Sequence, residues 1–540
     1  MARQLWCAEF RITLCLLFVT VTFQAKSQSQ LLPTSRDLNL KLGRQIYFDS
    51  SSVVHPALGP LFSDEVANDS ATRDSLLVGL NPKSQEWQKK NWIYRKLFLE
   101  HLIEVNDSGY TFYLDFLPDL QIGRGGSENL WLNTRGLELG GRIGKGFAFT
   151  SYFFENQARF PRYYTNYATE NRVIPGQGRA RSFGKYGFDY AYSGGTLSYT
   201  PSRYVNFQLG YDKNFIGDGY RSLLLSDNAF NYPFLKVTVT LGKVRYMAMY
   251  AQLIDFYEHF DLERYNQDNP YPKKNALFHY LSWNVSRRLS IGLFENVMWQ
   301  PRGFDFSYVN PLVFARPVEF ANGSPDKVLA GVNASYKIAD RYVVYGQFML
   351  NEFRGKDFFS GKGHWATKHG EQLGIKGFDI FKLERLNAQV EFNTVRPYSY
   401  SSKEHFTNYG HYNQPLAHPF GANFREFLAI ATYRYRRVDF RVQATSAMYG
   451  LDQGGLNFGK DIYKSYDTRV SEDGIFTGNG LRTNLYYADA RLAYILNPKN
   501  NLRLELGFTW RREKNVETSI QESFFNIGLR SSFRSLYTDF

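Results

Sequence analysis

Cysteine is almost absent from this chain, which has only Cys7 and Cys15 among its 540 residues. Both lie in a leading segment that we expect to be removed on export. The mature chain would then have no disulfide, no thiol nucleophile and no zinc–thiolate site. Oxidation is therefore not expected to hold the fold together.

Long apolar runs are also missing. The run ITLCLLFVTVTF follows Arg3 and Arg11 and is too short to cross a bilayer as a helix. With small residues at Ala25 and Ser27 behind it, this is the layout of a secretory signal peptide, so we predict a cleaved signal over residues 1–27. No later stretch reaches about 18 consecutive apolar residues, which argues against a helical membrane span.

Familiar catalytic motifs are missing as well. The chain has neither G-x-S-x-G nor H-E-x-x-H, and GRGGSENL at 123–130 lacks the lysine and the strand–loop–helix context of a phosphate loop. EHFTNYGHYNQPLAHPF gathers His405, His411 and His418, but a metal site would need them to converge with a further ligand. Hydrogen bonding within a folded loop is the simpler interpretation. We predict no enzyme activity, no cofactor and no metal site.

What the sequence has in abundance is aromatic residues, 17% of the chain, and segments with one apolar face. In NLRLELGFTW, residues 501–510, an apolar residue stands at every second position from Leu502 to Trp510. Successive side chains of a strand point to opposite faces, so this segment predicts a strand with one apolar and one polar face. About eighteen segments share this character, from TFYLDF (111–116) to FFNIGLRSSF (524–533). The mean hydropathy of −0.41 conceals them, because alternation averages out in any window.

The connections between these segments alternate in length. Short turns are expected at 143–145, 200–203, 241–243, 286–288, 338–341, 380–382, 436–437 and 497–500, and long connections at roughly 117–129, 156–190, 212–233, 256–275, 299–326, 354–369, 394–423, 450–483 and 511–522. Outer-membrane barrels have short periplasmic turns, longer outer loops and an even strand number. We therefore predict an all-β transmembrane barrel of about eighteen antiparallel strands over residues 109–540, in the outer membrane of a Gram-negative bacterium. A β-solenoid or propeller is the rival fold, but no repeat of fixed period is present.

Residues 28–108 do not share the strand pattern and are expected to form a periplasmic or plug segment. Ser84 can cap a helix in which Trp87, Tyr94, Leu97 and Leu102 follow helical spacing, so we predict a short helix near 84–105. This helix would lie against the periplasmic mouth or inside the lumen. Docking to a periplasmic partner is the alternative.

The chain ends in SSFRSLYTDF. A terminal aromatic residue closing the last strand resembles the signal that hands barrel proteins to the outer-membrane assembly machinery. We therefore expect that machinery as a partner during biogenesis and outer-membrane lipid as a partner afterwards.

The net charge of +13 can attract acidic polysaccharide, lipid head groups or nucleic acid, or it can reflect arginine lining a wet interior. Basic and aromatic residues gather in the expected outer loop 156–190. Aromatic faces stack on sugar rings and arginine binds carboxylates, so this loop is a candidate contact for an acidic surface polysaccharide or a secreted adhesin, rather than for nucleic acid. A solvated loop facing anionic lipid is the alternative. The candidate residues are Arg162, Tyr163, Tyr164, Tyr167, Arg172, Arg179 and Arg181.

The connection IGDGYRSLLLSDNAFNYPF, residues 216–234, has an apolar triplet in a loop that should be wet. We expect it to pack on itself or inside the barrel, with Gly217 and Gly219 permitting a tight turn. The candidate plug residues are Gly217, Asp218, Gly219, Arg221, Leu223, Leu224 and Leu225.

This stretch resembles the family of Wzi-like capsule-assembly barrels, and specifically RemB-type gliding-motility outer-membrane proteins. Further matching segments are FFENQARF (153–160), LSYTPSRYVNFQLG (197–210), HYLSWNVSRRLSIGLFENVMW (279–299), VEF with ANGS (318–324), NTVRPYSYS (393–401), NYGHYNQPLAHPFGANFRE (408–426) and LNPKNNLRLELG (496–507). The resemblance covers essentially the whole barrel region and implies a barrel of the predicted size. It brings no catalytic residues, and it implies a role in surface motility or, in the capsule branch, in retaining capsular polysaccharide.

The leading functional hypothesis is thus a non-enzymatic surface barrel that assists gliding motility or handles polysaccharide and adhesins. A general or substrate-specific diffusion porin is the alternative, since an even barrel with charged lumen strands would serve it. A barrel hydrolase would require a polar triad at one rim. Glycine- and aromatic-rich loops with internal apolar residues favour a plugged lumen over a porin.

Overall fold

A computed structural model describes residues 30–48, 53–66, 89–255, 271–300, 303–308, 317–318, 326–352 and 355–540. The predicted signal segment and the first part of the predicted 84–105 helix, residues 84–88, lie outside the described residues.

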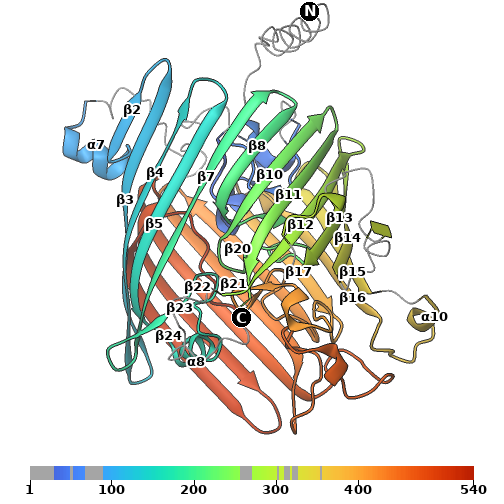
Figure 1. Cartoon of the computed structure of the whole chain (residues 1–540). Coiled ribbons are helices and arrows are strands. Elements are labelled where there is room, and N and C mark those ends of the chain that lie inside the picture. Colours follow the sequence, from blue (N-terminus) through green and yellow to red (C-terminus); the bar gives the residue numbers. More distant parts are fainter. Residues whose placement is uncertain are drawn as a thin grey trace, which may run out of the picture.

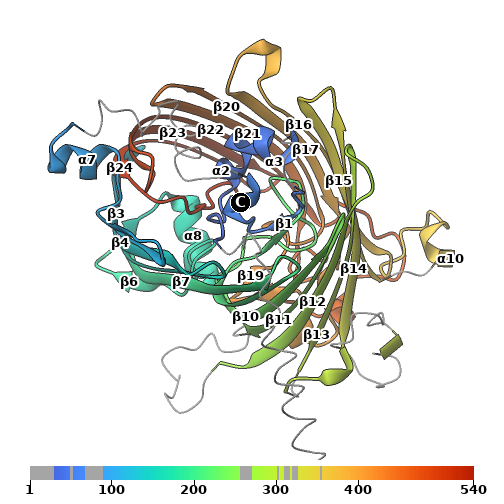
Figure 2. The same ribbon diagram turned by 90° about the horizontal axis from the view of Figure 1, so that it is seen from above.

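Eighteen antiparallel strands close into a barrel, which confirms the predicted fold (Figures 1 and 2). Each strand pairs with the next along the chain, and β24 pairs with β3 from Phe524↔Gly125 to Leu529↔Leu120 to close the ring. The strands are β3 (Tyr110–Gly125), β4 (Glu128–Ile143), β5 (Phe147–Arg159), β7 (Gly187–Ser202), β8 (Val205–Asp212), β10 (Tyr232–Leu241), β11 (Val244–Ile254), β12 (Lys273–Asn284), β13 (Leu289–Trp299), β14 (Lys327–Ile338), β15 (Tyr342–Glu352), β16 (Lys368–Gly377), β17 (Leu386–Val395), β20 (Phe424–Tyr435), β21 (Val438–Leu451), β22 (Leu481–Asn497), β23 (Leu502–Lys514) and β24 (Ser519–Arg530).

Two further strands extend this wall. β2 (Ile103–Asn106) pairs with the first residues of β3, and β6 (Arg181–Phe183) pairs with the start of β7. Other short elements in the connections include the helices α8 (Arg162–Asn171) and α10 (Gly355–Phe358) and the 3-10 turns η1 (Phe306–Tyr308), η2 (Ile380–Lys382), η3 (His405–Thr407) and η4 (Tyr466–Thr468).

Alternation along each strand separates an apolar outer face from a mainly polar inner face. On β23, Leu504 is 51% exposed whereas its neighbour Glu505 is 5% exposed. Leu209 on β8 is likewise exposed and the adjacent Gln208 is buried. A transmembrane barrel needs an apolar outer band, because water cannot hydrate polar groups that face the hydrocarbon core of the bilayer.

Two of the predicted long connections are wrong. β3 continues through 117–125 and turns into β4 after only two further residues, and β23 and β24 are joined by residues 515–518. The proline and glycines of LPDLQIGRGG suggested a loop. Pro118, however, lies between the part of β3 that pairs with β2 and the part that pairs with β24. The N–H that proline lacks therefore interrupts little pairing at this position. Gly126 at φ +59° makes the tight turn.

The predicted N-terminal helix is also different in place and length. Among the described residues 89–105, only α7 (Trp92–Phe98) is helical, Ile103–Asn106 belongs to strand β2, and α7 lies outside the barrel wall rather than in the lumen (Figures 1 and 2). The lumen instead holds an earlier segment with helices α2 (Arg36–Lys41), α3 (Gly43–Phe48) and α4 (Ser63–Val66) and the short strand β1 (Leu58–Gly59) (Figure 2). Among the described residues, no helix has the length and apolar character needed to span a membrane.

The C-terminal residues do not close the last strand, contrary to prediction. β24 ends at Arg530, and residues 531–540 turn into the lumen, where the chain ends (Figure 2). The terminal aromatic Phe540 packs against Tyr167 and Tyr164 in tilted and edge-to-face arrangements, with ring centroids 4.7 and 5.3 Å apart.

Candidate functional site

The lumen is filled by four segments, which we call the plug: the described N-terminal residues up to 66, the loop 213–231, the loop 396–423 and the tail 531–540. These segments are joined by backbone hydrogen bonds. In the loop 213–231, β9 (Phe215–Ile216) pairs with β1 of the N-terminal segment, and the N–H of Ser226 donates to Leu416 O of the loop 396–423 at 2.8 Å. Within the loop 396–423, β18 (Gly410–His411) pairs with β19 (Gln414–Pro415). Lys213 at the start of the first loop donates from Nζ to the carbonyl oxygens of Gly176 and Asp227 at 2.5 and 2.8 Å.

Gly217 allows the close approach of these segments. Its φ is +147°, its N–H donates to Ala57 O at 2.8 Å, and a Cβ there would stand 2.3 Å from Gln347 Nε2 on the wall. A side chain at this position would displace the Gln347 amide, which is hydrogen-bonded to Leu223 N and Ile216 O of the loop.

Arg221 is the ionic centre of the plug, and its side chain is only 1% exposed. Its Nη2 lies 2.9 Å from Glu426 Oε1 on β20 and 3.1 Å from Asp539 Oδ2 in the tail. The backbone N–H groups of Tyr220 and Arg221 donate to the Glu391 carboxylate at 2.8 and 3.1 Å. One guanidinium thus ties the loop to the wall and to the chain terminus.

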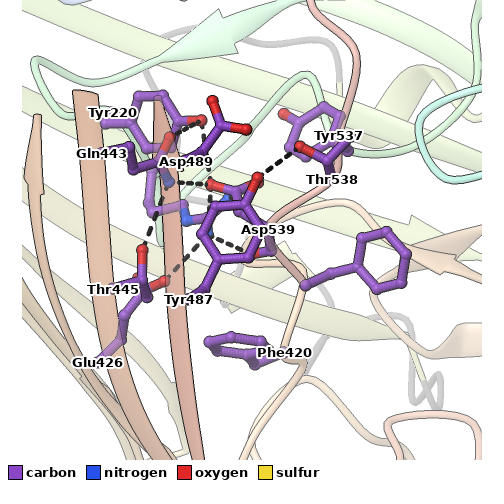
Figure 3. Close-up of polar contacts among 12 residues, drawn as sticks. Tyr220, Phe420, Glu426, Gln443, Thr445, Tyr487, Asp489, Tyr537, Thr538 and Asp539 are labelled. Carbon is purple, nitrogen blue, oxygen red and sulfur yellow. Dashed lines mark hydrogen bonds and ion pairs between the residues drawn. The ribbon is translucent and has the colours of Figure 1, made fainter. Parts of the chain in front are cut away.

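Asp539 receives further hydrogen bonds in this buried setting. Tyr220 Oη and Gln443 Nε2 donate to its Oδ2 at 3.0 and 2.6 Å (Figure 3). Burial alone would raise the pKa of the Asp539 carboxyl, but the guanidinium groups of Arg221 and Arg36 hold it below its usual range. Asp218 has no such cation in contact and is hydrogen-bonded by Tyr47 and Asn333 at 2.7 and 3.2 Å, so burial raises its pKa.

The apolar triplet of the loop is fully buried, as the sequence pattern suggested. Leu223, Leu224 and Leu225 belong to one core cluster with inward apolar side chains of the wall, among them Met247, Phe278, Leu329 and Met349. Tyr400 Oη and Tyr409 Oη, from the loop 396–423, donate to the carbonyl oxygens of Leu223 and Leu224 at 2.8 and 2.6 Å. The two loops therefore form one packed unit with the wall.

The predicted surface set in 156–190 is divided by the fold. Tyr163 and Tyr164 on α8 are buried and face inward against the tail, and Tyr167 packs against Phe540 with its ring tilted. These three tyrosines are thus engaged with the protein itself, which is a correction to the expected solvent-facing stack. Arg172, at φ +58° after α8, and Arg179 are half-buried. Arg162 and Arg181 are exposed and keep the position expected of a surface contact.

Two cavities remain between the plug and the wall, of about 240 and 320 Å³. The first is lined by Arg441, Arg491 and Arg503 together with Asp489 and Glu505. Arginine in this part of the wall is paired: Arg491 binds Asp489 at 2.6 Å and Arg503 binds Glu505 at 2.8 Å. Residues 532–535 of the tail border both cavities and stand between them.

The three histidines of the loop 396–423 do not converge. His405 Nδ1 contacts Asp255 at 3.1 Å, His411 is held by Ile254 N and Asn231 O at 2.9 and 3.1 Å, and His418 Nε2 contacts Glu426 at 2.7 Å. Within the described part of the chain, no group of three or more metal-ligating side chains is suited to hold an ion.

The chain matches no protein-family profile and no curated protein. Among solved structures it is similar to Wzi of Escherichia coli, an outer-membrane protein of group 1 capsule assembly described as a carbohydrate-binding β-barrel. That similarity has a TM-score of 0.55 at 13% identity over 94% of this chain and 100% of Wzi, and it establishes the barrel fold. OprD of Pseudomonas aeruginosa matches over 77% of this chain and 94% of its own with a TM-score of 0.42 at 11% identity. OccAB2 of Acinetobacter baumannii matches over 77% and 97% with a TM-score of 0.42 at 9% identity. These two values are too low to support an argument.

Proposed function

We propose that this protein is a non-enzymatic outer-membrane barrel with a closed lumen that handles an acidic surface polysaccharide or an adhesin at the cell surface. The observation that carries the proposal is the plug, in which Arg221 joins a loop, the wall and the C-terminus through buried ion pairs. A diffusion pore needs a continuous aqueous path, and this packing opposes one. The description of Wzi as a carbohydrate-binding barrel gives the proposal its ligand class.

Within this function we place the chain in the gliding-motility branch of the Wzi-like barrels, on the strength of the loop motifs that resemble RemB-type proteins. Deletion of the gene should reduce spreading on agar, weaken capsule retention, or both, without removing a chemical activity. A deletion strain that spreads and holds its capsule as the parent does would contradict both roles.

The ligand contact is proposed at the exposed arginines of the 156–190 connection, Arg162 and Arg181. Arginine binds carboxylates by paired hydrogen bonds, so polygalacturonate should bind immobilised protein and neutral dextran should not. The double variant Arg162→Ala, Arg181→Ala should bind less, with the largest difference at low salt, because exposed charges are screened by salt. Arg203→Ala is the matched control, since Arg203 is exposed in a short turn at the opposite end. Equal binding by all three proteins would exclude this contact.

A substrate-specific porin is the second candidate, and the two lumen cavities favour it. Planar-bilayer recording separates the two functions. A closed barrel gives no stable open-channel conductance, whereas a large and steady conductance of the purified full chain would establish the porin.

A further inference from the structure

The helix α7 and the strand β2 carry an apolar surface that the barrel does not cover. Trp92, Ile93 and Leu97 on α7 are 63%, 61% and 49% exposed, and none of the helix's residues is buried. Asn91 caps the helix by accepting a hydrogen bond from Tyr94 N–H at 2.8 Å, so the conformation is defined although its apolar face is uncovered.

The position of α7 is fixed at the end of the barrel that carries the short turns. Asn497, in the turn between β22 and β23, donates from Nδ2 to Lys96 O and Glu100 O at 3.1 and 2.9 Å. His101 Nδ1 contacts Asp115 on β3, and the N–H of Leu102 donates to the same carboxylate at 2.9 Å. Both figures place the helix beside the outer surface of the wall (Figures 1 and 2).

β2 joins this surface to the apolar band of the barrel. Ile103 pairs with Leu114 and Val105 with Phe112, and directly opposed residues of two strands share a face. Ile103 and Val105 are exposed, as are Tyr110 and Ile143 on the neighbouring strands. The uncovered surface is therefore continuous with the face that meets lipid.

The charges around α7 are mainly positive. Lys89 and Lys90 are exposed just before the helix, and Arg95 and Lys96 both contact Glu100 at 3.2 and 3.0 Å. Exposed tryptophan and leucine on one face with lysine and arginine around them are characteristic of helices that lie in a membrane interface.

From this geometry we infer that α7 and β2 form a membrane-surface anchor, with Trp92, Ile93 and Leu97 inserted at the headgroup boundary of the periplasmic leaflet and the exposed Lys89 and Lys90 against anionic phospholipid. This anchor is independent of the proposed ligand. β24 pairs only with the second part of β3, from Leu120 to Gly125, and β2 pairs with the first part, from Thr111 to Leu114. The anchor would fix the depth and tilt of the barrel at this first part of β3.

Site-directed nitroxide labelling tests the anchor directly. Replacing Cys7 and Cys15, the only cysteines, by serine gives a clean background for single-cysteine variants. Leu97→Cys is the test position, Arg95→Cys the control on another face of the same helix, Leu504→Cys the lipid reference and Val516→Cys, in the turn 515–518, the water reference. The refolded proteins are reconstituted into phosphatidylethanolamine–phosphatidylglycerol vesicles and labelled, and collisions with oxygen and with a nickel chelate are compared.

The anchor predicts that the label at Leu97→Cys resembles that at Leu504→Cys, with high oxygen and low nickel accessibility, while Arg95→Cys lies nearer to Val516→Cys. Free access of the nickel chelate to Leu97→Cys, equal to that at Val516→Cys, overturns the proposal and leaves the surface to a periplasmic protein. A second measurement covers the case in which labelling disturbs α7. The quenching of tryptophan fluorescence by brominated phospholipid is compared between the unlabelled chain and the variant Trp92→Phe. Identical quenching in the two proteins also overturns it.

Discussion

Arg221 and Asp539 are 318 residues apart in the chain and meet at 3.1 Å inside the barrel. Arg221 also donates to the backbone carbonyl of Asp539 at 2.8 Å, so it holds the terminal segment by its main chain as well as by its carboxylate. Arg36 lies over the rings of Tyr220 and Tyr537, 4.4 and 3.9 Å from their centroids, and brings the N-terminal segment to the same point. Both ends of the described chain and the buried loop 213–231 thus meet at one cluster.

Replacing Arg221 by methionine should destabilise the protein strongly. The change removes the guanidinium that contacts both buried carboxylates, Glu426 and Asp539, and breaking a buried pair costs about 3–5 kcal/mol. Urea unfolding in detergent micelles measures this loss. The control Arg181→Met removes an exposed arginine and should change the free energy of unfolding by about 0.5 kcal/mol or less. Similar losses in the two variants would mean that the cluster contributes little.

His411 should make the plug sensitive to mild acid. Burial lowers the pKa of His411 to about 3, and its Nδ1 accepts the N–H of Ile254, which a protonated ring could not do. Its pKa in the unfolded chain is about 6.5, so the unfolded state binds the extra proton as the pH falls from about 6.5 to about 3. Stability then decreases over this window, by at most about 1.4 kcal/mol per pH unit from this group.

The variant His411→Gln should be less stable at neutral pH but lose less stability between about pH 6.5 and pH 4. Thermal unfolding followed at a series of pH values measures both effects. Parallel pH profiles for the variant and the parent would show that His411 titrates normally in the folded protein.

Strand positions could be predicted from the sequence because lipid and lumen impose opposite chemistry on alternate residues. The alternation of apolar and polar residues is weaker where the inner face of a strand contacts the plug instead of water. The inner faces of β11 and β12 carry Met247, Met249, Ala276 and Phe278, since they contact Leu223–Leu225 rather than solvent. Strand β20, FREFLAIATYRY, is apolar on both faces for the same reason. Phe424 and Leu428 pack inward against the plug, and Phe427 faces outward.

Individual plug residues could be predicted only in the loop 213–231, where an apolar triplet stood in a segment expected to be wet, whereas for residues 28–108 the sequence left a periplasmic and a plug segment open. The N-terminal part has helices of four to six residues, too short to show a periodic pattern. The tail has no local signal at all, because its partners are Arg221, Gln443 and Tyr163, far away in sequence. Contacts of this kind depend on the closed barrel and cannot be recognised segment by segment.

Arginine substitutions on the outer face of β23 should report depth in the bilayer. Phe508 lies near the middle of this strand and Leu504 near its short-turn end, and both are exposed. Phe508→Arg should cost about 2–4 kcal/mol and Leu504→Arg about 0–1 kcal/mol, because the penalty falls toward the interface. Equilibrium folding into lipid vesicles measures both. Val516→Arg in the adjoining turn is the matched control, and equal costs at all three positions would contradict the assignment of the lipid face.

The tail 531–540 is expected to close the lumen, and removing it should open a path for ions. Its residues 532–535 stand between the two cavities of about 240 and 320 Å³, and Asp539 and Tyr537 attach it to Arg221 and Asp227. A chain ending at Arg530 should show stable conductance in planar bilayers where the full chain shows none. Because truncation can impair assembly, migration of unheated protein on a gel checks that the barrel is folded. The full-length double variant Tyr537→Phe, Asp539→Asn loosens the same attachment and should conduct intermittently. A folded, truncated barrel that stays as silent as the parent would assign closure to the other three segments of the plug.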